Sequence, residues 1–194
     1  MMMIGIARER VLSDSDLIGE SLRSPAVFFE LFDRHFQPLH RFLQARGVGD
    51  GAADLAAETF VVAFRRRASF DRGRADARPW LFGIALNLAR NEARSERRRL
   101  RALPSLVERP DATDADVVAR LDSQAMPLRE ALAGLAEDER DVLLLYAGEE
   151  LTYEEIADAL GVAVGTVKSR LHRARTKVRA KLEQHQEGVG GDVG

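Results

Sequence analysis

The chain has 194 residues, of which 45% are hydrophobic and 31% are charged, and its formal net charge is −2. This composition is ordinary for a globular protein, and the length suffices for one domain or two small ones. The absence of cysteine excludes disulfides, a thiolate metal site and a cysteine nucleophile. No apolar run approaches the roughly 20 residues of a membrane-spanning helix, and the N-terminal apolar stretch is too short for a signal peptide. We therefore expect a cytoplasmic protein without membrane insertion.

The helical pattern of apolar residues dominates the chain, and the alternation typical of strands is absent. Proline follows a capping residue at Ser24-Pro25, which predicts the start of a helix with a kink at Pro38. A second helix is expected over 52–67, and a third helix begins at Pro79.

The second half of the chain starts with an acidic stretch over 102–127 that contains three prolines. Such a composition predicts a flexible linker. Four more helices are expected at roughly 128–135, 138–147, 152–160 and 164–184. The fold class is therefore all-α, with two small helical domains joined by a flexible acidic linker.

Charge is unevenly distributed over these segments. Residues 61–101 hold 12 arginines against 4 acids, and residues 164–181 hold 7 basic side chains and no acid. Residues 102–163 between them hold 15 acids against 4 arginines. A basic block indicates either phosphate contact or a solvated helix face, and two blocks in helical segments favour a nucleic-acid partner.

The last two helices have the signals of a helix-turn-helix. Thr152 and Glu155 form a capping box, in which each side chain satisfies a free backbone N–H of the other residue. Gly161 ends that helix at the position where a left-handed residue is needed, and a new helix begins three residues later.

The final helix separates into an apolar face and a basic face when its residues are placed at 100° intervals. The apolar face consists of Val167, Leu171, Ala174, Val178 and Leu182, and the opposite face carries Ser169, His172, Arg173 and Thr176 beside Lys168. Arg173 can donate two hydrogen bonds to a guanine edge, Lys168 can reach a base or a phosphate, and Ser169 can bond to either. An amphipathic surface helix with solvated charges is the alternative. The combination of capping box, glycine turn and basic face favours DNA binding.

The helix that begins at Pro79 has a narrow polar stripe on an otherwise apolar surface. The stripe contains Trp80, Gly83, Asn87, Arg90, Asn91, Arg94 and Arg98. A single strand of nucleic acid could occupy it, with Asn87 at a base edge, Trp80 and Phe70 stacking, and arginines on phosphates. The alternative is that the two aromatic residues belong to the core and that the arginines are solvated.

Other kinds of site find no support. The four histidines, at positions 35, 40, 172 and 185, lack companion ligands at metal-binding spacing. A glycine-rich phosphate loop and a catalytic triad order are also absent. We expect neither an enzyme nor a bound cofactor or metal.

Three segments together resemble a bacterial RNA polymerase sigma factor of the extracytoplasmic-function (ECF) group. They are DGAADLAAETFVVAFRR, FDRGRADARPWLFGIALNLARNEARSERRR and LAEDERDVLLLYAGEELTYEEIADALGVAVGTVKSRLHRAR. The resemblance implies a domain order: an N-terminal segment (1–23), a region 2 domain (24–101), a linker (102–127), a region 4 helix-turn-helix domain (128–185) and a disordered tail (186–194). Region 2 would bind core RNA polymerase and open the −10 element, and region 4 would read the −35 element. Promoter DNA and an anti-sigma factor are the other implied partners.

The resemblance and the helical wheels together assign three groups of site residues. For the −10 element they are Phe70, Trp80, Asn87, Asn91, Arg94 and Arg98. For the −35 element they are Lys168, Ser169, His172 and Arg173. For docking of core polymerase they are Asp54, Leu55, Glu58 and Phe60, with Ala57 standing where the family has glutamine.

Two other functions remain open at this point. One is a stand-alone transcriptional regulator that binds duplex DNA and uses its first domain to sense or dimerise. The other is an enzyme acting on nucleic acid, which is disfavoured because no acid cluster is placed for a metal. For the acidic segment 102–163 between the two basic blocks, the hypothesis is that it repels duplex DNA until polymerase holds both domains in place.

Overall fold

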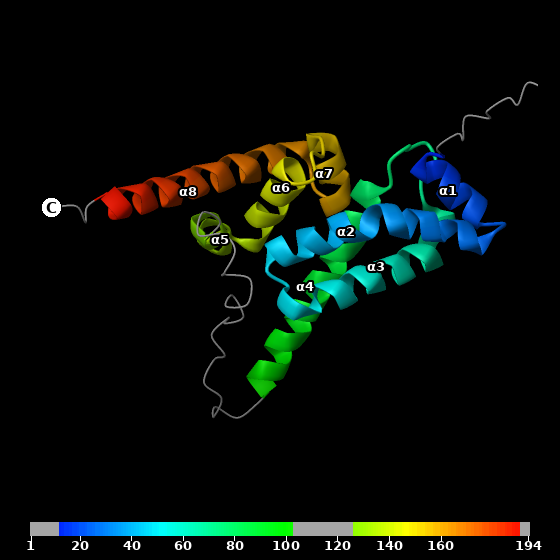
Figure 1. Cartoon of the computed structure of the whole chain (residues 1–194), viewed down its shortest axis with the longest axis horizontal. Helices are drawn as coiled ribbons and strands as arrows, with labels where there is room; N and C mark the ends of the chain where they lie inside the picture. Colours follow the sequence, from blue (N-terminus) through cyan, green and yellow to red (C-terminus); the bar gives the residue numbers. More distant parts are fainter. Residues whose placement is uncertain (1–11, 103–125, 191–194) are drawn as a thin grey trace, which may run out of the picture.

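The computed structural model describes residues 12–102 and 126–190, which fold into helices joined by short turns (Figure 1). The helices are α1 (Asp14–Ser21), α2 (Phe28–Arg46), α3 (Ala52–Arg66), α4 (Arg78–Ala102), α5 (Met126–Ala133), α6 (Glu137–Ala147), α7 (Tyr153–Leu160) and α8 (Val164–Gly190). The all-α prediction is confirmed. Across these residues, no helix combines the length and the apolarity that crossing a bilayer requires.

The first domain is built by α2, α3 and α4, which pack against one another. Their apolar faces meet in a core in which Leu31, Leu43 and Leu86 are fully buried. Pro25 occupies the first position of a short 3₁₀ turn that precedes α2, as expected for a residue without a backbone N–H. Pro38 lies inside α2, which continues unbroken to Arg46.

Helix α1 was not expected, because the sequence analysis treated the first 23 residues as a segment outside the domain. Ser13 and Asp16 form a capping box at its start. Its apolar residues Leu17 and Ile18 are fully buried in the same core as α2 and α3. The first domain therefore extends at least to residue 13, and the Ser13-x-x-Asp16 pattern is the signal that could have revealed it.

The carboxylate of Asp14 joins three segments of the first domain. It lies 2.8 Å from Nε2 of His35 on α2, and it accepts a hydrogen bond of 3.0 Å from the backbone N–H of Ala77, just before α4. Arg34 donates to the same carboxylate at 3.3 Å. Burial raises the pKa of Asp14, but the bonds from His35, Ala77 and Arg34 outweigh burial and hold that pKa below its ordinary 3.8.

We expect Asp14→Asn to lower the free energy of unfolding at pH 7 by about 1–3 kcal/mol, because a buried N–H and a guanidinium lose their charged acceptor. A carboxyl with a lowered pKa in the folded state contributes stability above its unfolded pKa. That contribution is lost as pH falls through the folded pKa. The difference between wild type and variant should therefore shrink below about pH 4, near the ordinary Asp value of 3.8. Urea denaturation at pH 7 and pH 3.5 measures this difference in the free energy of unfolding. The control is Asp33→Asn, which replaces an exposed carboxylate on α2.

The second domain contains α5 to α8, close to the expected positions. Thr152 and Glu155 form the predicted capping box at the start of α7. Gly161 has the predicted left-handed conformation (φ 64°), where the chain turns from α7 into α8. Helix α8 continues to Gly190, so the prediction of a disordered tail is wrong for residues 186–190. The rest of that tail (191–194) and most of the predicted linker (103–125) lie outside the described residues.

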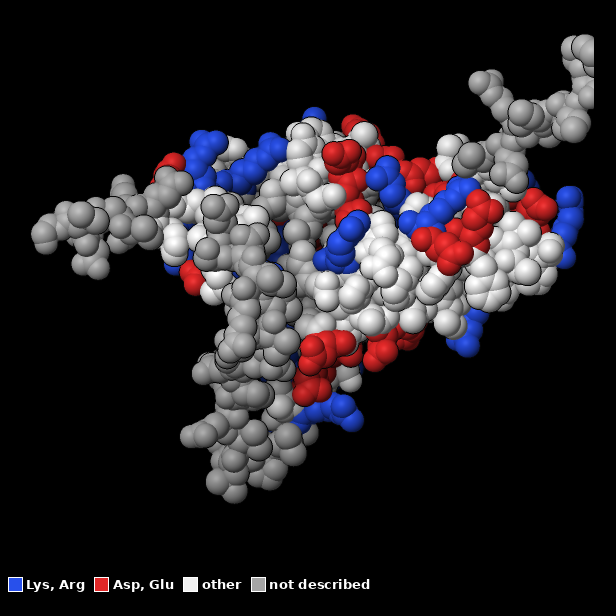
Figure 2. Space-filling view, in the orientation of Figure 1, with Lys and Arg blue, Asp and Glu red and all other residues white. Residues whose placement is uncertain are grey.

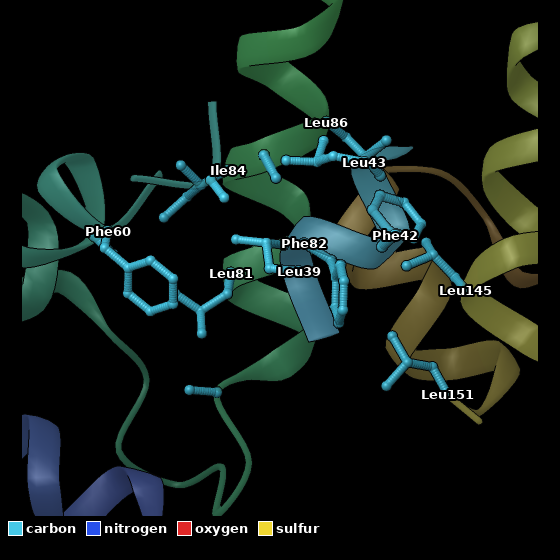
Figure 3. Packing of buried hydrophobic residues seen from close by; sticks show 14 of the residues in the cluster. Leu39, Phe42, Leu43, Phe60, Leu81, Phe82, Ile84, Leu86, Leu145 and Leu151 are labelled. Carbon is cyan, nitrogen blue, oxygen red and sulfur yellow. The ribbon is translucent and has the colours of Figure 1, made fainter. Parts of the chain in front are cut away.

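The two domains pack against each other, which the sequence analysis did not predict. Helix α4 contacts α7, and α2 contacts α6. In Figure 3, Leu145 of the second domain lies beside Phe42 of the first domain, whose ring meets that of Phe82 edge-on at 4.9 Å, and Leu151 belongs to the same buried cluster. One continuous cluster of buried side chains therefore includes residues of both domains.

The acids in the first half of α6 have arginine partners from the first domain and from α8. Asp141 is fully buried and accepts hydrogen bonds from Arg46 (2.7 Å) and Arg90 (3.0 Å) of the first domain. Burial raises the pKa of Asp141, and the two guanidinium groups oppose that rise. Asp138 accepts a 2.6 Å hydrogen bond from Arg170 on α8. These carboxylates therefore neutralise arginines of their own chain, a role that the repulsion hypothesis did not include.

Candidate nucleic-acid interface

The outer face of α8 is presented by the helix-turn-helix as the sequence predicts. Val167, Leu171 and Ala174 are buried against the second domain. The opposite side is exposed, and it contains all four residues predicted to read the −35 element: Lys168, Ser169, His172 and Arg173. Basic side chains follow α8 in Figure 2. This face can donate hydrogen bonds to base edges and to phosphates.

Two tyrosines support the basic side chains near the start of α8. The rings of Tyr146 on α6 and Tyr153 on α7 stack with centroids 5.4 Å apart. The ammonium of Lys168 lies 5.6 Å from the Tyr153 ring, and the guanidinium of Arg175 lies 4.7 Å from the Tyr146 ring. Cation–π contacts of this length restrain the two long side chains while their charges stay exposed. The sequence analysis missed this pair of tyrosines.

Glu139 of α6 contacts α8 at Arg173 and Lys177. Its carboxylate accepts a 2.7 Å hydrogen bond from Lys177 and lies 3.7 Å from Nε of Arg173. The hydrogen bond from Lys177 lowers the pKa of Glu139, so this acid is ionised beside the basic face. Arg173 remains 59% exposed, which leaves its guanidinium accessible to DNA. The sequence did not predict this pairing, and the run of three acids at 137–139 is the signal that could have revealed it.

The polar stripe of α4 is divided between solvent and the second domain. Asn87, Asn91, Arg94 and Arg98 are exposed. Trp80 is half-buried, and its ring lies 5.1 Å from that of Phe70. Phe70 is only 6% exposed, which fits the alternative that it is a core residue. Asn87 lies seven residues beyond Trp80, so the two lie on the same side of α4, about 10 Å apart along the helix.

The predicted docking residues on α3 occupy two different environments. Asp54 and Glu58 are exposed and lie one turn apart on the same face. Leu55 and Phe60 are buried, and the Phe60 ring contacts Phe32 edge-on at 4.9 Å. The apolar pair therefore holds α3 in place, and the two carboxylates are the groups that a partner could touch. Within the described residues, no three His, Asp or Glu side chains gather as a metal site.

Comparison with protein-family models identifies two matching regions. Residues 31–99 match Sigma-70 region 2, and residues 125–178 match Sigma-70 region 4. These matches cover most of α2 and α4, all of α3, and the second domain from α5 to the middle of α8.

Curated proteins and solved structures support the same assignment. The chain is 35% identical over 136 residues to the ECF RNA polymerase sigma factor EcfG of Rhodopseudomonas palustris (strain TIE-1), covering 70% of this chain and 74% of that one. It is 32% identical over 169 residues to the ECF RNA polymerase sigma factor SigL of Mycobacterium tuberculosis (strain H37Rv), covering 86% and 94%.

Among solved structures, CnrH in complex with the cytosolic domain of CnrY has a TM-score of 0.65 at 26% identity, covering 88% of this chain and 97% of that one. The sigma factor RpoE of Bartonella quintana, in complex with the anti-sigma factor NepR, has a TM-score of 0.64 at 26% identity, covering 80% and 96%. With both regions in order and relatives that align over most of their length, this chain belongs to the ECF family of RNA polymerase sigma factors.

Proposed function

We propose that this ECF sigma factor uses three separate surfaces to direct RNA polymerase to promoters. The exposed carboxylates of α3 dock core polymerase, the stripe of α4 holds the separated strand at the −10 element, and the outer face of α8 reads the −35 element. The observation that carries the proposal is the exposed donor set on α8, which the helix-turn-helix presents with its apolar side buried.

The α8 surface suits a major groove. Arg173 supplies the two-pronged donor that matches a guanine edge, and Lys168 and Ser169 supply single donors for bases or phosphates. The Tyr146–Tyr153 pair and Glu139 restrain the neighbouring cations, so fewer side-chain rotamers are lost when DNA binds.

The α4 surface suits a single strand. The amides of Asn87 and Asn91 can bond to base edges, and Arg94 and Arg98 can neutralise phosphates. Capture of an extruded base offsets part of the cost of unstacking it, and each base stacked on an aromatic ring contributes about 1–3 kcal/mol. Trp80 is the ring available for stacking, and Phe70 supports it from the core.

This mechanism makes and breaks no bond on the sigma factor itself, so we propose a regulatory subunit without a cofactor rather than an enzyme. Its place is in the cytoplasm with the polymerase. A protein antagonist is a further proposed partner. The solved structures of CnrH and of Bartonella quintana RpoE hold CnrY and the anti-sigma factor NepR, and their folds are similar to this one.

The direct test is transcription of a genomic promoter library by core polymerase, with and without this protein. We expect new transcript starts that share upstream sequence elements, found by sequencing the 5′ ends of the transcripts. A protein that adds no starts and does not bind polymerase, yet binds a duplex sequence alone, would instead be a stand-alone regulator.

We expect Arg173→Ala to weaken binding of the polymerase complex to a promoter by about 1–3 kcal/mol, or roughly 5- to 150-fold, if it reads a base. Titration of promoters that carry single substitutions in the upstream element measures this effect. The loss should be largest for the preferred base and small for its replacements. Arg179→Ala, an exposed cation two turns away on α8, is the control. An equal loss on every upstream sequence would reduce Arg173 to a phosphate contact.

A further inference from the structure

Helix α1 belongs to none of the three proposed surfaces, yet it contacts the loop that joins α3 to α4. It lies before residue 31, where the match to Sigma-70 region 2 begins. The loop (71–77) leads from Phe70 to the start of α4, where Trp80 lies, so it separates the two aromatic rings assigned to the −10 surface. In Figure 1 the loop runs beside α1. Its position therefore determines how this end of the −10 surface is built.

Bonds within the loop shape its turn but do not fix where the turn lies. The backbone N–H of Arg74 donates to the backbone oxygen of Asp71 at 3.1 Å, and the N–H of Gly73 donates to the Asp71 carboxylate at 3.0 Å. Both bonds join residues two or three positions apart, so they form wherever the turn lies. Arg74 also pairs with Asp158 of α7 at 2.7 Å, but both side chains are about half exposed, and such pairs contribute little.

Helix α1 holds the loop at three points along the chain. At the end of the loop, Asp14 accepts the hydrogen bond from the N–H of Ala77. In its middle, the hydroxyl of Ser15 donates a 2.9 Å hydrogen bond to the backbone oxygen of Arg72. Before its start, α1 packs against the 3₁₀ turn Arg67–Ser69. Because the apolar side of α1 is fully buried, the helix is a fixed support for these contacts.

A fourth contact depends on a glycine. The guanidinium of Arg72 lies across α1 at Gly19, where an added Cβ would be 2.6 Å from Nη2 and 2.8 Å from Cζ. Real Cβ atoms do not come so close to other atoms, so alanine at this position would displace the guanidinium. Glycine weakens a helix interior relative to alanine, and α1 has only eight residues. The close approach of Arg72 is therefore the feature of the structure that uses Gly19.

We infer that α1 is a positioning element of the −10 surface, in which Ser15 and Gly19 hold the loop and Arg72 in one arrangement before the promoter strand binds. This role of α1 rests on the proposed function of the α4 stripe. A surface that is already ordered loses less entropy on binding. The preferred strand benefits most, because it makes the most contacts with the ordered surface. A loosened loop should therefore weaken discrimination between −10 sequences.

The first experiment measures amide hydrogen exchange of Arg74 and Ala77 in the free full-length chain. Ser15→Ala removes the hydroxyl bond to Arg72, and it should speed exchange of both amides about two- to tenfold, as expected for one lost hydrogen bond. Ser15→Thr keeps the hydroxyl and should restore wild-type exchange. The control is Ser24→Ala, which removes an exposed hydroxyl that makes no capping bond and should change neither amide.

The second experiment measures transcription by core polymerase from promoters with single base substitutions in the −10 or the −35 element. In Ser15→Ala, the ratio of transcription from preferred and substituted −10 elements should fall about two- to tenfold, and the −35 ratio should stay the same. A mere loss of stability would lower transcription from all promoters alike and leave both ratios unchanged. Unchanged amide exchange, or faster exchange with an unchanged −10 ratio, would overturn the role of α1.

Gly19→Ala separates positioning from stability. Alanine favours a helix interior, so the midpoint of thermal unfolding should not fall, while the displaced Arg72 should lower the −10 ratio. In an Arg72→Ala background, Gly19→Ala should add no further loss, because the displaced group is already gone. A further loss there would contradict the inferred contact. The matched control is Gly51→Ala, whose new Cβ would meet only Val48 at 3.8 Å.

The role of α1 and the proposed function fail in different ways. Amide exchange in the free chain reports whether α1 holds the loop, whatever the protein binds. If the wild type directs no transcription, the proposed function fails and the role of α1 fails with it. If the wild type is active and Ser15→Ala keeps its −10 ratio, only the role of α1 fails.

Discussion

Reversal of both exposed charges on α3, Asp54→Arg with Glu58→Arg, should weaken binding of core RNA polymerase by at least about 100-fold. Each substitution replaces a carboxylate with a cation, and like charges brought together across an interface cost several kcal/mol. Folding should be preserved because both side chains are exposed, while the neighbouring Leu55 and Phe60 keep the buried packing of the helix. Titration of labelled core polymerase with the full-length chain measures the affinity.

The matched control is the double reversal Glu92→Arg with Glu96→Arg. These two carboxylates are also exposed and also one turn apart, but they lie on α4. They change the net charge by the same amount and should leave polymerase affinity nearly unchanged. Equal losses in the two double variants would show an effect of overall charge, and α3 would then lose its assignment as the docking surface.

We expect Phe82→Ala to lower the free energy of unfolding by about 3–5 kcal/mol, the usual cost of deleting a fully packed phenylalanine ring. Phe82 is 2% exposed and packs edge-on against Phe42, in the part of the core where both domains meet. For a chain of this size the midpoint of thermal unfolding should fall by roughly 10 °C. Phe29→Ala removes an equally large ring that is 70% exposed, and it should change stability by less than about 0.5 kcal/mol.

The same variant tests how far the two domains unfold together. Trp80, the single tryptophan, reports on the first domain by fluorescence, and circular dichroism reports on all helices. Because the buried cluster is continuous, the two signals should coincide in the wild type. They should separate in Phe82→Ala if the shared core is what joins the domains. Coincident transitions in the variant would place the coupling elsewhere, in the ion pairs around Asp141.

The helices of the second domain and the reading face of α8 follow from the sequence because their signals are local. A capping box and a left-handed glycine act within four residues, so Thr152, Glu155 and Gly161 mark the ends of α7 without knowledge of the rest of the fold. The periodicity of α8 is likewise a property of one helix. It correctly separated the buried Val167 and Leu171 from the exposed side.

Burial at the site could be judged only in part from the same patterns. The sequence placed Phe70 and Phe60 in functional groups, and the structure shows both rings packed inside the first domain. The sequence pattern of an aromatic residue is the same whether its ring is exposed for stacking on a base or packed in a core. Which of the two it does depends on the segments that surround it, and for Phe70 the half-buried Trp80 is the ring that packs against it.

The sequence by itself determined the helices, their apolar faces and the two basic blocks, because each depends on residues a few positions apart. Only the tertiary structure decided that α1 belongs to the first domain and that the two domains close on each other. A helical wheel shows that Arg90 projects from a polar stripe, but its partner Asp141 is 51 positions away. Whether that guanidinium meets water, a phosphate or a carboxylate is set by how closely two backbones approach, and Gly83 permits the approach seen here.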